Sequence, residues 1–432
     1  MISKGIFIVL LLGAFLLFYR NAKAILMNIQ LGKKLPITDN KLLRWKTMLK
    51  VAIGQSKISK RPISGMLHII VYVGFIIVNI EMVEIVYDGI FGTHRVLNFL
   101  PFYNMLVTTL EVLAAMVIMA CIVFLIRRNI LKINRFESVE ITRWPRLDAN
   151  IILFTEIILM LAFLTMNTAD TLQQSAHEVG PFLISGFLTP LLTGFDAAVL
   201  HLIERSAWWV HIVGVLAFLN YIPYSKHFHI LLAFPNVYYS KLKPLAYISN
   251  MESITHEVKI AMGLETDQNV QNAEPVAFGA QDVKDLSWKS LMDAYSCTEC
   301  GRCTSVCPAN LTGKKLSPRK IVMDTRDRLE EIGVQMRKQG KDFIDGKTLL
   351  SNYITTEEVW ACTTCNACTY ECPVNIDPLS IIIELRRYIF MEKAAAPSSL
   401  NAMSVNIENN GAPWQYSIAD RYNWALDLEL IK

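Results

Sequence analysis

The stretch CTECGRCTSVCP at residues 297–308 decides how the C-terminal half of this chain folds. The same spacing, Cys-x2-Cys-x2-Cys-x3-Cys-Pro, returns in CTTCNACTYECP at residues 362–373, so eight of the nine cysteines belong to two copies of one pattern. Three thiolates this close together on one loop can reach three irons of one cubane. The fourth thiolate, which lies further along and precedes a proline, binds the neighbouring cubane. The pattern therefore predicts two iron–sulfur centres.

We assign the eight thiolates crosswise between two [4Fe–4S] centres. The ligands of the first centre are Cys297, Cys300, Cys303 and Cys372. The ligands of the second centre are Cys362, Cys365, Cys368 and Cys307. Structural zinc usually binds two separated cysteine pairs rather than four cysteines in a tight run, so the spacing disfavours zinc. A disulfide scaffold is disfavoured because the distribution of basic residues places this half of the chain in a reducing compartment.

The rest of the chain is rich in apolar residues. Hydrophobic residues make up 53% of the 432 residues and charged residues only 19%. A soluble chain carries about a quarter charged residues, so this composition indicates a part that lies in a bilayer, and it excludes a disordered or collagen-like chain. Five apolar runs approach or exceed the roughly 20 residues that a membrane-spanning helix needs. These runs are 5–18, 66–87, 105–126, 149–166 and 207–234.

We therefore predict a mainly α-helical protein in which a five-span bundle precedes an α-helical cluster-binding domain. Residues 182–203 are apolar as well, but Gly186, Pro190 and Gly194 interrupt them, so we expect a re-entrant or interfacial element there.

The distribution of charge orients the spans. Residues 20–61 contain eleven Lys or Arg and a single acid, Asp39. Basic loops stay on the cytoplasmic side of a membrane. We therefore expect a multi-pass protein of the bacterial inner membrane, with its N-terminus outside and its cluster-binding half in the cytoplasm. Attraction to anionic membrane lipids explains the basic block, and we expect no nucleic-acid partner because no folded module surrounds it.

Histidines within the spans indicate a second type of cofactor. His68 and His229 lie near the cytoplasmic ends of the second and fifth spans. Ionisable residues in spans mark functional sites by default, and a neutral imidazole from each of two helices can bind one haem iron. The alternative is hydrogen bonding within the bundle. His211 precedes His229 by eighteen residues, so on a continuous helix the two would share one face, about 27 Å apart.

Residues 211–229, which contain YIPYSKHFH, resemble the last spans of the nitrate reductase gamma-subunit superfamily of b-type cytochromes. That family places two haem-ligating histidines eighteen residues apart around a Pro-Phe-Ser-Arg/Lys element. The resemblance covers residues 1–240 and implies that the two histidines near the cytoplasmic side bind haem b. The family's other ligand on the second span falls here on Val78, so a second haem, at His211, requires a different ligand. The candidates are His94, His177, His201 and Met82.

The residues around the cysteine motifs predict helices. Ser317-Pro318 and Asp377-Pro378 favour helices over 319–338 and 378–392. The arrangement resembles the α-helical dicluster ferredoxin domain of succinate dehydrogenase iron–sulfur subunits and of the heterodisulfide reductase family. We expect a transmembrane cytochrome b-like domain, a linker, the ferredoxin domain and a C-terminal tail. Their limits are 1–240, 241–289, 290–393 and 394–432. The tail either contacts a partner or packs on its own chain.

The motifs that this sequence lacks limit the classes of function that it can have. The chain has no dinucleotide fingerprint, phosphate loop or nucleophile motif, and it lacks the cysteine-rich repeats that carry the catalytic cluster of heterodisulfide reductases. It resembles a fusion of the b-cytochrome and ferredoxin parts of membrane-bound heterodisulfide reductase-like iron–sulfur oxidoreductases. The resemblance implies an oxidoreductase subunit that carries electrons between a cytoplasmic partner and (mena)quinone. That partner would be a cysteine-rich iron–sulfur subunit or an electron-transfer flavoprotein. The alternative is a membrane anchor or redox sensor with structural clusters and no quinone site.

Polar residues toward the outer side of the spans indicate where quinone would bind. His211 lies just inside Trp208 and Trp209, an aromatic pair typical of the membrane interface, and Glu81 is at a similar depth. We expect a redox or quinone site there. Its residues would be His211, His94, Arg95 and Glu81.

Overall fold

The computed structural model describes residues 2–173, 182–245, 247–264, 277–340 and 342–431, which form helices joined by loops with two isolated β-bridges. Five helices in this part of the chain are long and apolar enough to cross a membrane. They are α1 (Ile2–Ile29), α3 (Pro62–Phe91), α4 (Tyr103–Leu125), α5 (Trp144–Gln173) and α7 (Ala197–Tyr221). The predicted class, a five-span bundle followed by an α-helical domain, is confirmed.

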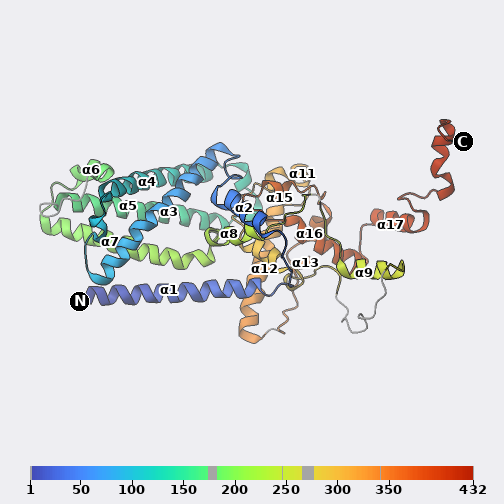
Figure 1. Ribbon diagram of the computed structural model, residues 1–432, viewed down its shortest axis with the longest axis horizontal. Coiled ribbons are helices and arrows are strands. Elements are labelled where there is room, and N and C mark those ends of the chain that lie inside the picture. The colour runs from blue at the N-terminus through green and yellow to red at the C-terminus, as the bar shows by residue number, and fades with distance from the viewer. Residues whose placement is uncertain (1, 174–181, 246, 265–276, 341, 432) are drawn as a thin grey trace.

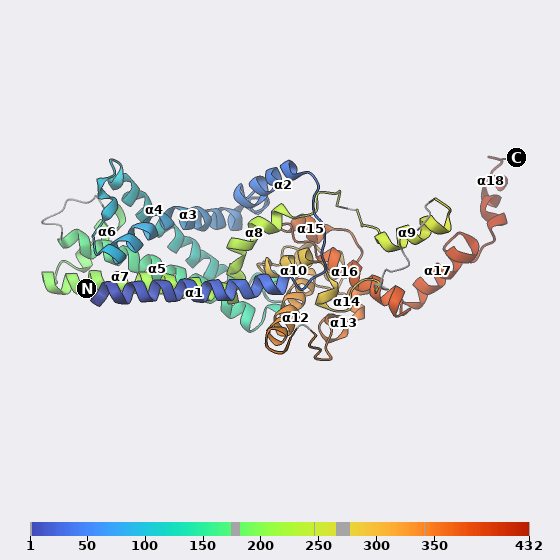
Figure 2. The ribbon, with the colours of Figure 1, turned by 60° about the horizontal axis from the view of Figure 1, so that its bottom comes forward.

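The molecule is elongated. The long helices form one end of it, and the cluster-binding part follows them along the long axis (Figure 1). Helices α3, α4, α5 and α7 pack together, and α1 runs along their edge and on into the cluster-binding part (Figure 2). We call residues 277–393 the cluster domain. The end of the bundle beside this domain is the near end, and the opposite end, where the N-terminus lies, is the far end.

The cluster domain contains three main helices and several short ones. The main helices are α10 (Trp288–Tyr295), α12 (Pro318–Gln339) and α16 (Pro378–Arg387). The short helices are α11 (Pro308–Leu311), α13 (Leu349–Asn352), α14 (Thr356–Trp360) and α15 (Ala367–Glu371). The helices predicted over 319–338 and 378–392 are confirmed, the second because a π-helical turn extends α16 to Glu392. Ser317 and Asp377 cap the two helices through their side-chain oxygens, as the sequence predicts.

The last predicted span differs from the structure. Helix α7 ends at Tyr221, and a separate helix, α8 (His229–Tyr238), follows two short 3₁₀ turns. Ser225 between those turns has an extended backbone, with φ −115° and ψ 152°. The expectation of one continuous helix over 207–234 is therefore wrong, and His211 and His229 do not share one helical face. The apolar run continues through the break, so hydropathy alone does not reveal it.

The apolar segment before this span also differs in its limits. Residues 183–188 form the short helix α6 (Leu183–Leu188) at the far end, but residues from Ala197 onward already belong to the spanning helix α7. The first span is longer than expected, because α1 continues from the apolar run 5–18 to Ile29.

The chain extends away from the cluster domain at its C-terminus. Helices α17 (Ser398–Asn410) and α18 (Asn423–Asp427) project from the body of the molecule (Figures 1 and 2). Helix α17 has no buried residue, and Trp414 and Trp424 are exposed. This segment offers an apolar surface on the side of the cluster domain that faces away from the bundle.

One hydrophobic core joins the bundle to the cluster domain. It contains Ile29 of α1 and Leu232 of α8 together with Leu291 of α10 and Ile321 of α12, all of them buried. Leu286, just before α10, is fully buried in the same core. Because these residues pack as one cluster, the cluster domain is attached to the near end of the bundle through buried side chains.

The residues that follow α1 pack backbone against backbone with the cluster domain. After the helix, the Lys33 backbone N–H donates to the Leu286 carbonyl at 2.7 Å, and the Trp288 N–H donates to the Lys33 carbonyl at 3.1 Å. Gly32 permits this approach, because a Cβ placed there would lie 2.6 Å from the backbone nitrogen of Trp288. Only a residue without a side chain fits between the two backbones.

We predict that Gly32→Ala destabilises the attachment of α1 to the cluster domain. The added methyl group meets backbone atoms that cannot rotate away, and such overpacking typically costs about 1–3 kcal/mol. Thermal unfolding of the purified protein in detergent should show a lower midpoint. Gly13→Ala is the matched control, because a Cβ at Gly13 on the same helix meets nothing within 4 Å. Equal midpoints for the two variants would contradict the prediction.

Candidate functional site

The two cysteine motifs fold into loops of the same shape. Two and four positions after the leading cysteine of the first motif, Glu299 and Gly301 have positive φ angles of 55° and 70°. Thr364 and Asn366 occupy the same places in the second motif, with φ angles of 57° and 59°. In both loops the residue two positions after the leading cysteine donates its N–H to that cysteine's sulfur at 3.4 Å. The sequence repeat is therefore also a structural repeat.

The thiols of the two motifs lie close to one another in a crosswise pattern. Cys372 of the second motif is within electrostatic range of Cys297 and Cys300 of the first. Cys362 of the second motif is within range of Cys307 of the first. These are the neighbours that the two predicted ligand sets require. The two ligand sets also lie next to each other. Cys303 is within electrostatic range of Cys372, which belongs to its own set, and of Cys368, which belongs to the other set.

The chemistry of the thiols suits iron–sulfur clusters. Burial raises the pKa of Cys297 and of Cys372 to about 12, so these thiols keep their protons at neutral pH unless a cation replaces them. Within the described ranges, no three His, Cys, Asp or Glu side chains converge closely enough to hold a single metal ion. A cubane is larger than an ion and binds one thiolate at each iron, so thiols that are grouped but separated fit it.

A buried carboxylate ties the first cysteine loop to both halves of the molecule. Glu299 receives hydrogen bonds from Lys226, in the turn between α7 and α8, and from Arg326 of α12, the latter at 3.0 Å. Lys226 also lies 3.8 Å from Asp148 of α5. Burial would raise the pKa of Glu299, but the two cations outweigh it and hold that pKa below its usual value. The sequence analysis missed this contact, although a charged residue between two cysteine ligands was a visible signal.

A second contact joins the cysteine motifs to the segment before α3. Arg302 donates to the carbonyls of Lys57 and Ile58 at 2.9 and 3.2 Å. The Lys57 ammonium in turn lies 3.2 Å from the Cys372 carbonyl, to which it donates. Cys300 is near Arg302 as well. The predicted first cluster site therefore faces the bundle, whereas Cys365 of the second site is exposed.

The structure brings together the histidines predicted near the cytoplasmic side. His68 on α3 is within electrostatic range of His229 at the start of α8, and of Arg302. The rings of His227 and His229 are 5.5 Å apart. His68 Nδ1 is buried and has no hydrogen-bond partner among the described residues. His229 Nδ1 is 3.0 Å from the Lys226 carbonyl.

These histidines would suit the ligation of haem iron. Burial lowers the pKa of His229 and lowers that of His227 to about 3, so both imidazoles are neutral at physiological pH, as iron ligation would require. A ligating histidine usually donates its other ring N–H to a carbonyl, which is the contact that His229 makes. His68 Nδ1, which has no hydrogen-bond partner among the described residues, and His229 Nε2 are the ring nitrogens that would hold such an iron.

His211 lies in a different environment, deeper in the bundle. Its Nδ1 is 2.9 Å from the Leu159 carbonyl, and it lines a cavity of about 80 Å³ with Val78, Met82 and Glu156. Val78 is the position at which the family resemblance places the missing ligand. The cavity is much smaller than the roughly 300–1,000 Å³ of pockets for drug-sized ligands, and Val78 supplies no ligand atom to it.

The other candidate partners of His211 lie elsewhere. His94 and His201 are on the far-end loops and helix start, within 3.7 Å of Asp170 and 4.0 Å of Glu204. His177 lies outside the described residues. Met82 alone among the described candidates shares a cavity with His211.

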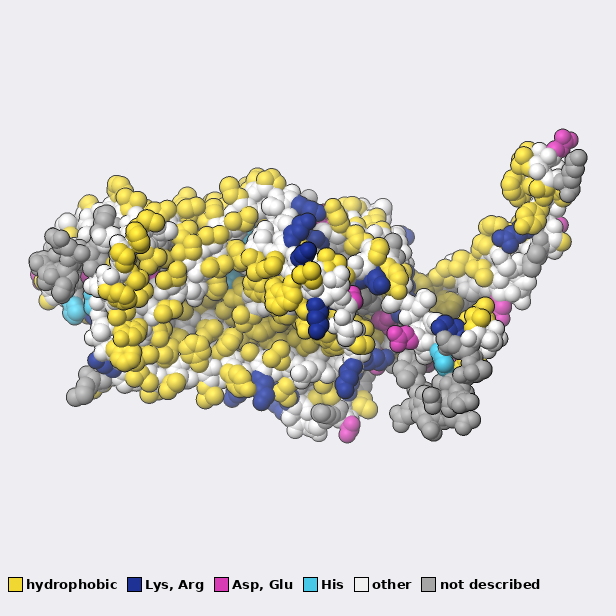
Figure 3. Space-filling model, viewed as in Figure 1, with side chains coloured by type: hydrophobic (Ala, Val, Ile, Leu, Met, Phe, Trp, Pro, Cys, Tyr) yellow, Lys and Arg dark blue, Asp and Glu magenta, His cyan; other side chains and the backbone are white. Residues whose placement is uncertain are grey.

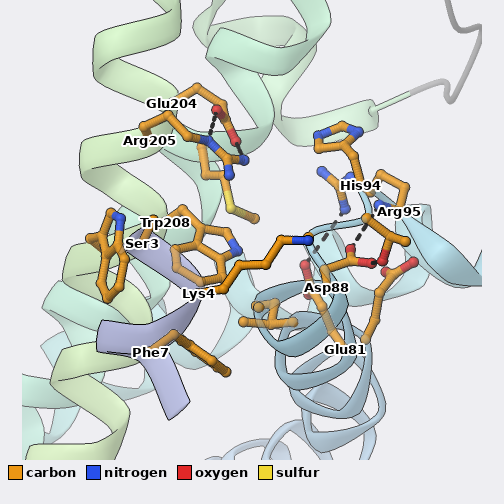
Figure 4. Close-up of a pocket in the computed structure, with 17 residues that line it drawn as sticks. Ser3, Lys4, Phe7, Glu81, Asp88, His94, Arg95, Glu204, Arg205 and Trp208 are labelled. Atoms are coloured by element: carbon orange, nitrogen blue, oxygen red, sulfur yellow. Dashed lines mark hydrogen bonds and ion pairs between the residues drawn. The ribbon is translucent and has the colours of Figure 1, made fainter. Parts of the chain in front are cut away.

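The far end of the bundle contains a cavity of about 240 Å³ (Figure 4). Glu81, His94 and Arg95 line it, as predicted, together with Lys4 and Trp208, which the sequence analysis did not include. His211 does not line it. The structure therefore brings three of the four expected residues together and separates the fourth.

Glu81 is the exceptional carboxylate at this end. It is 3% exposed, and neither of its oxygens accepts a hydrogen bond from a described residue; the nearest cation, Arg95, is 3.7 Å away. In contrast, Glu84 accepts from the Tyr103 hydroxyl and Glu111 accepts from Asn167. A buried carboxylate without a donor is costly, so Glu81 is the group in this cavity that a ligand would satisfy.

Comparison with known proteins places the cysteine motifs in a recognised class. A family model described as a 4Fe-4S dicluster domain matches residues 296–376, which contain all eight motif cysteines. The structure and this match together identify a 4Fe-4S dicluster domain in the C-terminal half of the chain.

The relatives are iron–sulfur oxidoreductases. The chain is 28% identical to the probable iron-sulfur-binding oxidoreductase FadF of Bacillus subtilis, over 97% of this chain and 60% of that protein. It is 24% identical to the EtfAB:quinone oxidoreductase of Syntrophomonas wolfei, over 86% of this chain and 52% of that protein. A shorter match, 33% identical over 24% of this chain and 52% of the relative, is to one of the CoB-CoM heterodisulfide reductase subunits of Methanosarcina acetivorans.

The chain thus spans between half and three fifths of the length of these relatives. No solved structure matches it.

We predict that Cys307→Ser damages the centre whose other ligands come from the second motif. Serine replaces a ligand that the crosswise pattern assigns to Cys362, Cys365 and Cys368, although Cys307 belongs to the first motif in sequence. Quantifying the two reduced centres by electron paramagnetic resonance tests the assignment. Cys121→Ser, at a buried cysteine of α4 outside both motifs, is the control and should leave both centres intact. A loss confined to the centre bound by the other cysteines of the first motif would refute crosswise ligation.

Proposed function

We propose that this protein is a membrane electron-transfer subunit that connects a cytoplasmic redox partner with the quinone pool. One observation carries the proposal: the 4Fe-4S domain is attached by a buried core and buried ion pairs to the end of a spanning bundle, and His68 lies there within electrostatic range of Arg302 of the first cysteine motif. Iron–sulfur clusters supply one-electron transfer when bound.

We further propose that His68 and His229 bind one b-type haem at the near end. Their side chains come from two different helices, α3 and α8, and bundles build cofactor sites from residues on separate helices. The role of Arg302 is to hold the loop of the first cysteine set against this region. We propose a single haem, because Val78 occupies the position of the second ligand that the family resemblance places on α3.

The far-end cavity is the proposed site for a quinone head group. Glu81 would accept a hydrogen bond from a quinol hydroxyl, and Arg95 would donate to a carbonyl or phenolate oxygen. Arg95 is itself held by Asn167 at 2.6 Å and by Asp170 at 3.3 Å, so its position does not depend on the ligand. Glu81 follows His68 by thirteen residues on α3, about 20 Å along the helix axis.

The partner and the location are proposed from the relatives and from charge. One relative is named an EtfAB:quinone oxidoreductase and another belongs to a heterodisulfide reductase, so an electron-transfer flavoprotein or a cysteine-rich iron–sulfur subunit is the partner that we propose. The tail beyond the cluster domain, with Trp414 and Trp424 exposed, offers a contact surface for it. The basic segment before α3 supports a cytoplasmic position for the cluster domain, at a bacterial inner membrane.

The alternative is a membrane anchor or redox sensor without a quinone site. Glu81 favours the first proposal, because an anchor does not need a buried carboxyl group that accepts no hydrogen bond in a cavity of its bundle. Haem content and the rate of quinone reduction separate these functions.

We predict that His229→Ala abolishes haem absorbance while both iron–sulfur centres persist. The substitution removes one proposed axial ligand. The ratio of haem to cluster iron in the purified protein is the measurement. His201→Ala, at an exposed histidine of the far end, is the control and should keep the wild-type ratio. An unchanged ratio in His229→Ala, or a wild-type protein without haem, would remove the assignment.

We predict that Glu81→Gln slows quinol-linked electron transfer by about a hundredfold or more, the size expected when a group that exchanges protons is lost. Haem and cluster contents should not change. Glu204→Gln is the matched control, because Glu204 lines the same cavity but already pairs with Arg205. The rate of reduction of a water-soluble quinone analogue measures the effect. Equal rates in the two variants would leave Glu81 without a role in quinone chemistry.

A further inference from the structure

The two cysteine sites differ in the charge that surrounds them. Lys and Arg side chains are sparse over the bundle and gather where it meets the cluster domain (Figure 3). Several of these cations lie around the first set of cysteines, and the second set has few. Because iron–sulfur potentials depend on nearby charge, hydrogen bonds to sulfur and exposure to solvent, this difference has a chemical consequence.

Arg302 is the closest of these cations in sequence, between two ligands of the first set. It is 5% exposed and lies within range of Cys300 and Cys372. Its guanidinium donates to the carbonyls of Lys57 and Ile58, and it forms no ion pair within 4.0 Å with a described acid. The charge of Arg302 is therefore buried without an ion pair, and Glu371, the carboxylate within electrostatic range of it, pairs with Arg61.

Arg135 adds a second charge without an ion pair. This residue is partly buried and comes from the loop between α4 and α5, and Cys300 is the group that most favours its positive charge. Its Nε is buried without a hydrogen-bond partner, and no described acid lies within ion-pair distance. Two other arginines of the region are compensated, since Arg61 lies 3.5 Å from Glu371 and Arg326 binds Glu299. Lys57, whose ammonium donates to the Cys372 carbonyl, adds to the uncompensated positive charge on this side.

The second cysteine set has balanced charge. Arg386 donates to the Cys362 carbonyl at 2.5 Å and to the Val359 carbonyl at 2.9 Å. Asp377 lies near Cys368 and opposes this cation.

Hydrogen bonds to sulfur do not separate the two sets. In the first set, Cys297 accepts a backbone N–H from Glu299 at 3.4 Å, and Cys372 accepts one from Ile376 at 3.3 Å. In the second set, Cys362 accepts one from Thr364 at 3.4 Å, and Cys368 lies 3.9 Å from the Thr369 hydroxyl. The exposure of Cys365 acts against the difference in charge, because water also stabilises a reduced centre.

We propose that Arg135 and Arg302 hold the cluster bound by Cys297, Cys300, Cys303 and Cys372 at a higher reduction potential than the cluster beside Cys365. Reduction adds one negative charge to a centre, and a buried arginine, which stays protonated, stabilises that added charge. A single electron on the pair then passes from the outer centre to the centre that faces the bundle, which is reduced while the outer centre is left oxidised. The inference rests on the proposed ligand sets but not on the haem or quinone sites.

The test is a redox titration of the full-length protein, followed by electron paramagnetic resonance. Cys365→Ser identifies the signal of the outer centre. In the wild type, the centre facing the bundle should be reduced first. Arg302→Gln should shift its midpoint to lower potential and leave the outer centre unchanged, whereas Arg302→Lys should restore most of the wild-type value. Arg386→Gln is the matched control and should lower only the outer midpoint.

Two results would overturn the inference. The first is that the outer centre is reduced first in the wild type. The second is that Arg302→Gln shifts both midpoints equally or neither. If Arg302→Gln does not fold, Arg135→Gln removes the charge of the other arginine without an ion pair and should lower the same midpoint. If the two potentials do not have the expected order but quinone reduction is intact, this inference is wrong and the proposed function stands. If the potentials have the expected order but the protein does not reduce quinone, the inference stands and the proposed function is wrong.

Discussion

The position of one buried carboxylate, Glu299, constrains how the cluster domain packs against the bundle. Glu299 lies inside the first cysteine motif and is bonded on one side by Lys226 of the bundle and on the other by Arg326 of the cluster domain. A buried charge is tolerated only when its partners are present and well placed. The carboxylate needs both cations, although Lys226 also lies 3.8 Å from Asp148 and Arg326 lies 3.2 Å from Asp327. The cysteine loop cannot shift against the bundle without separating the buried Glu299 carboxylate from Lys226.

This constraint explains why the histidines and thiols occupy the same region. The turn that supplies Lys226 also supplies the carbonyl that orients His229, so the ion pair and the imidazole are positioned by the same few residues. Of the two arginines without an ion pair, Arg302 donates to the carbonyls of Lys57 and Ile58, and Arg135 lies over the ring of Phe136. Positive charge is thus kept next to the cysteine motif without an ion pair to an acid.

Much of the architecture was predictable from the sequence, and the reasons are local. Cysteine spacing identifies cluster ligands, apolar runs identify spans, and the Ser-Pro and Asp-Pro pairs mark where α12 and α16 begin. The break before His229 was not predicted, because hydropathy records burial and does not record backbone direction. The pair of Lys226 and Glu299, 73 residues apart, and the approach of Lys4 to the cavity of Glu81 depend on how helices pack. No pattern within a single segment encodes such contacts.

The long first helix has a consequence for biosynthesis. Helix α1 leaves the ribosome first, yet Asn28 near its end donates to the hydroxyl of Tyr295, which is 267 residues later in the chain. Contacts between residues so far apart in the sequence form late in folding. While the rest of the chain is translated, the buried end of α1 has only lipid, water or chaperones as neighbours. A ribosome that stalls after the bundle would release a membrane protein with an open apolar face, which is the kind of species that quality-control proteases remove.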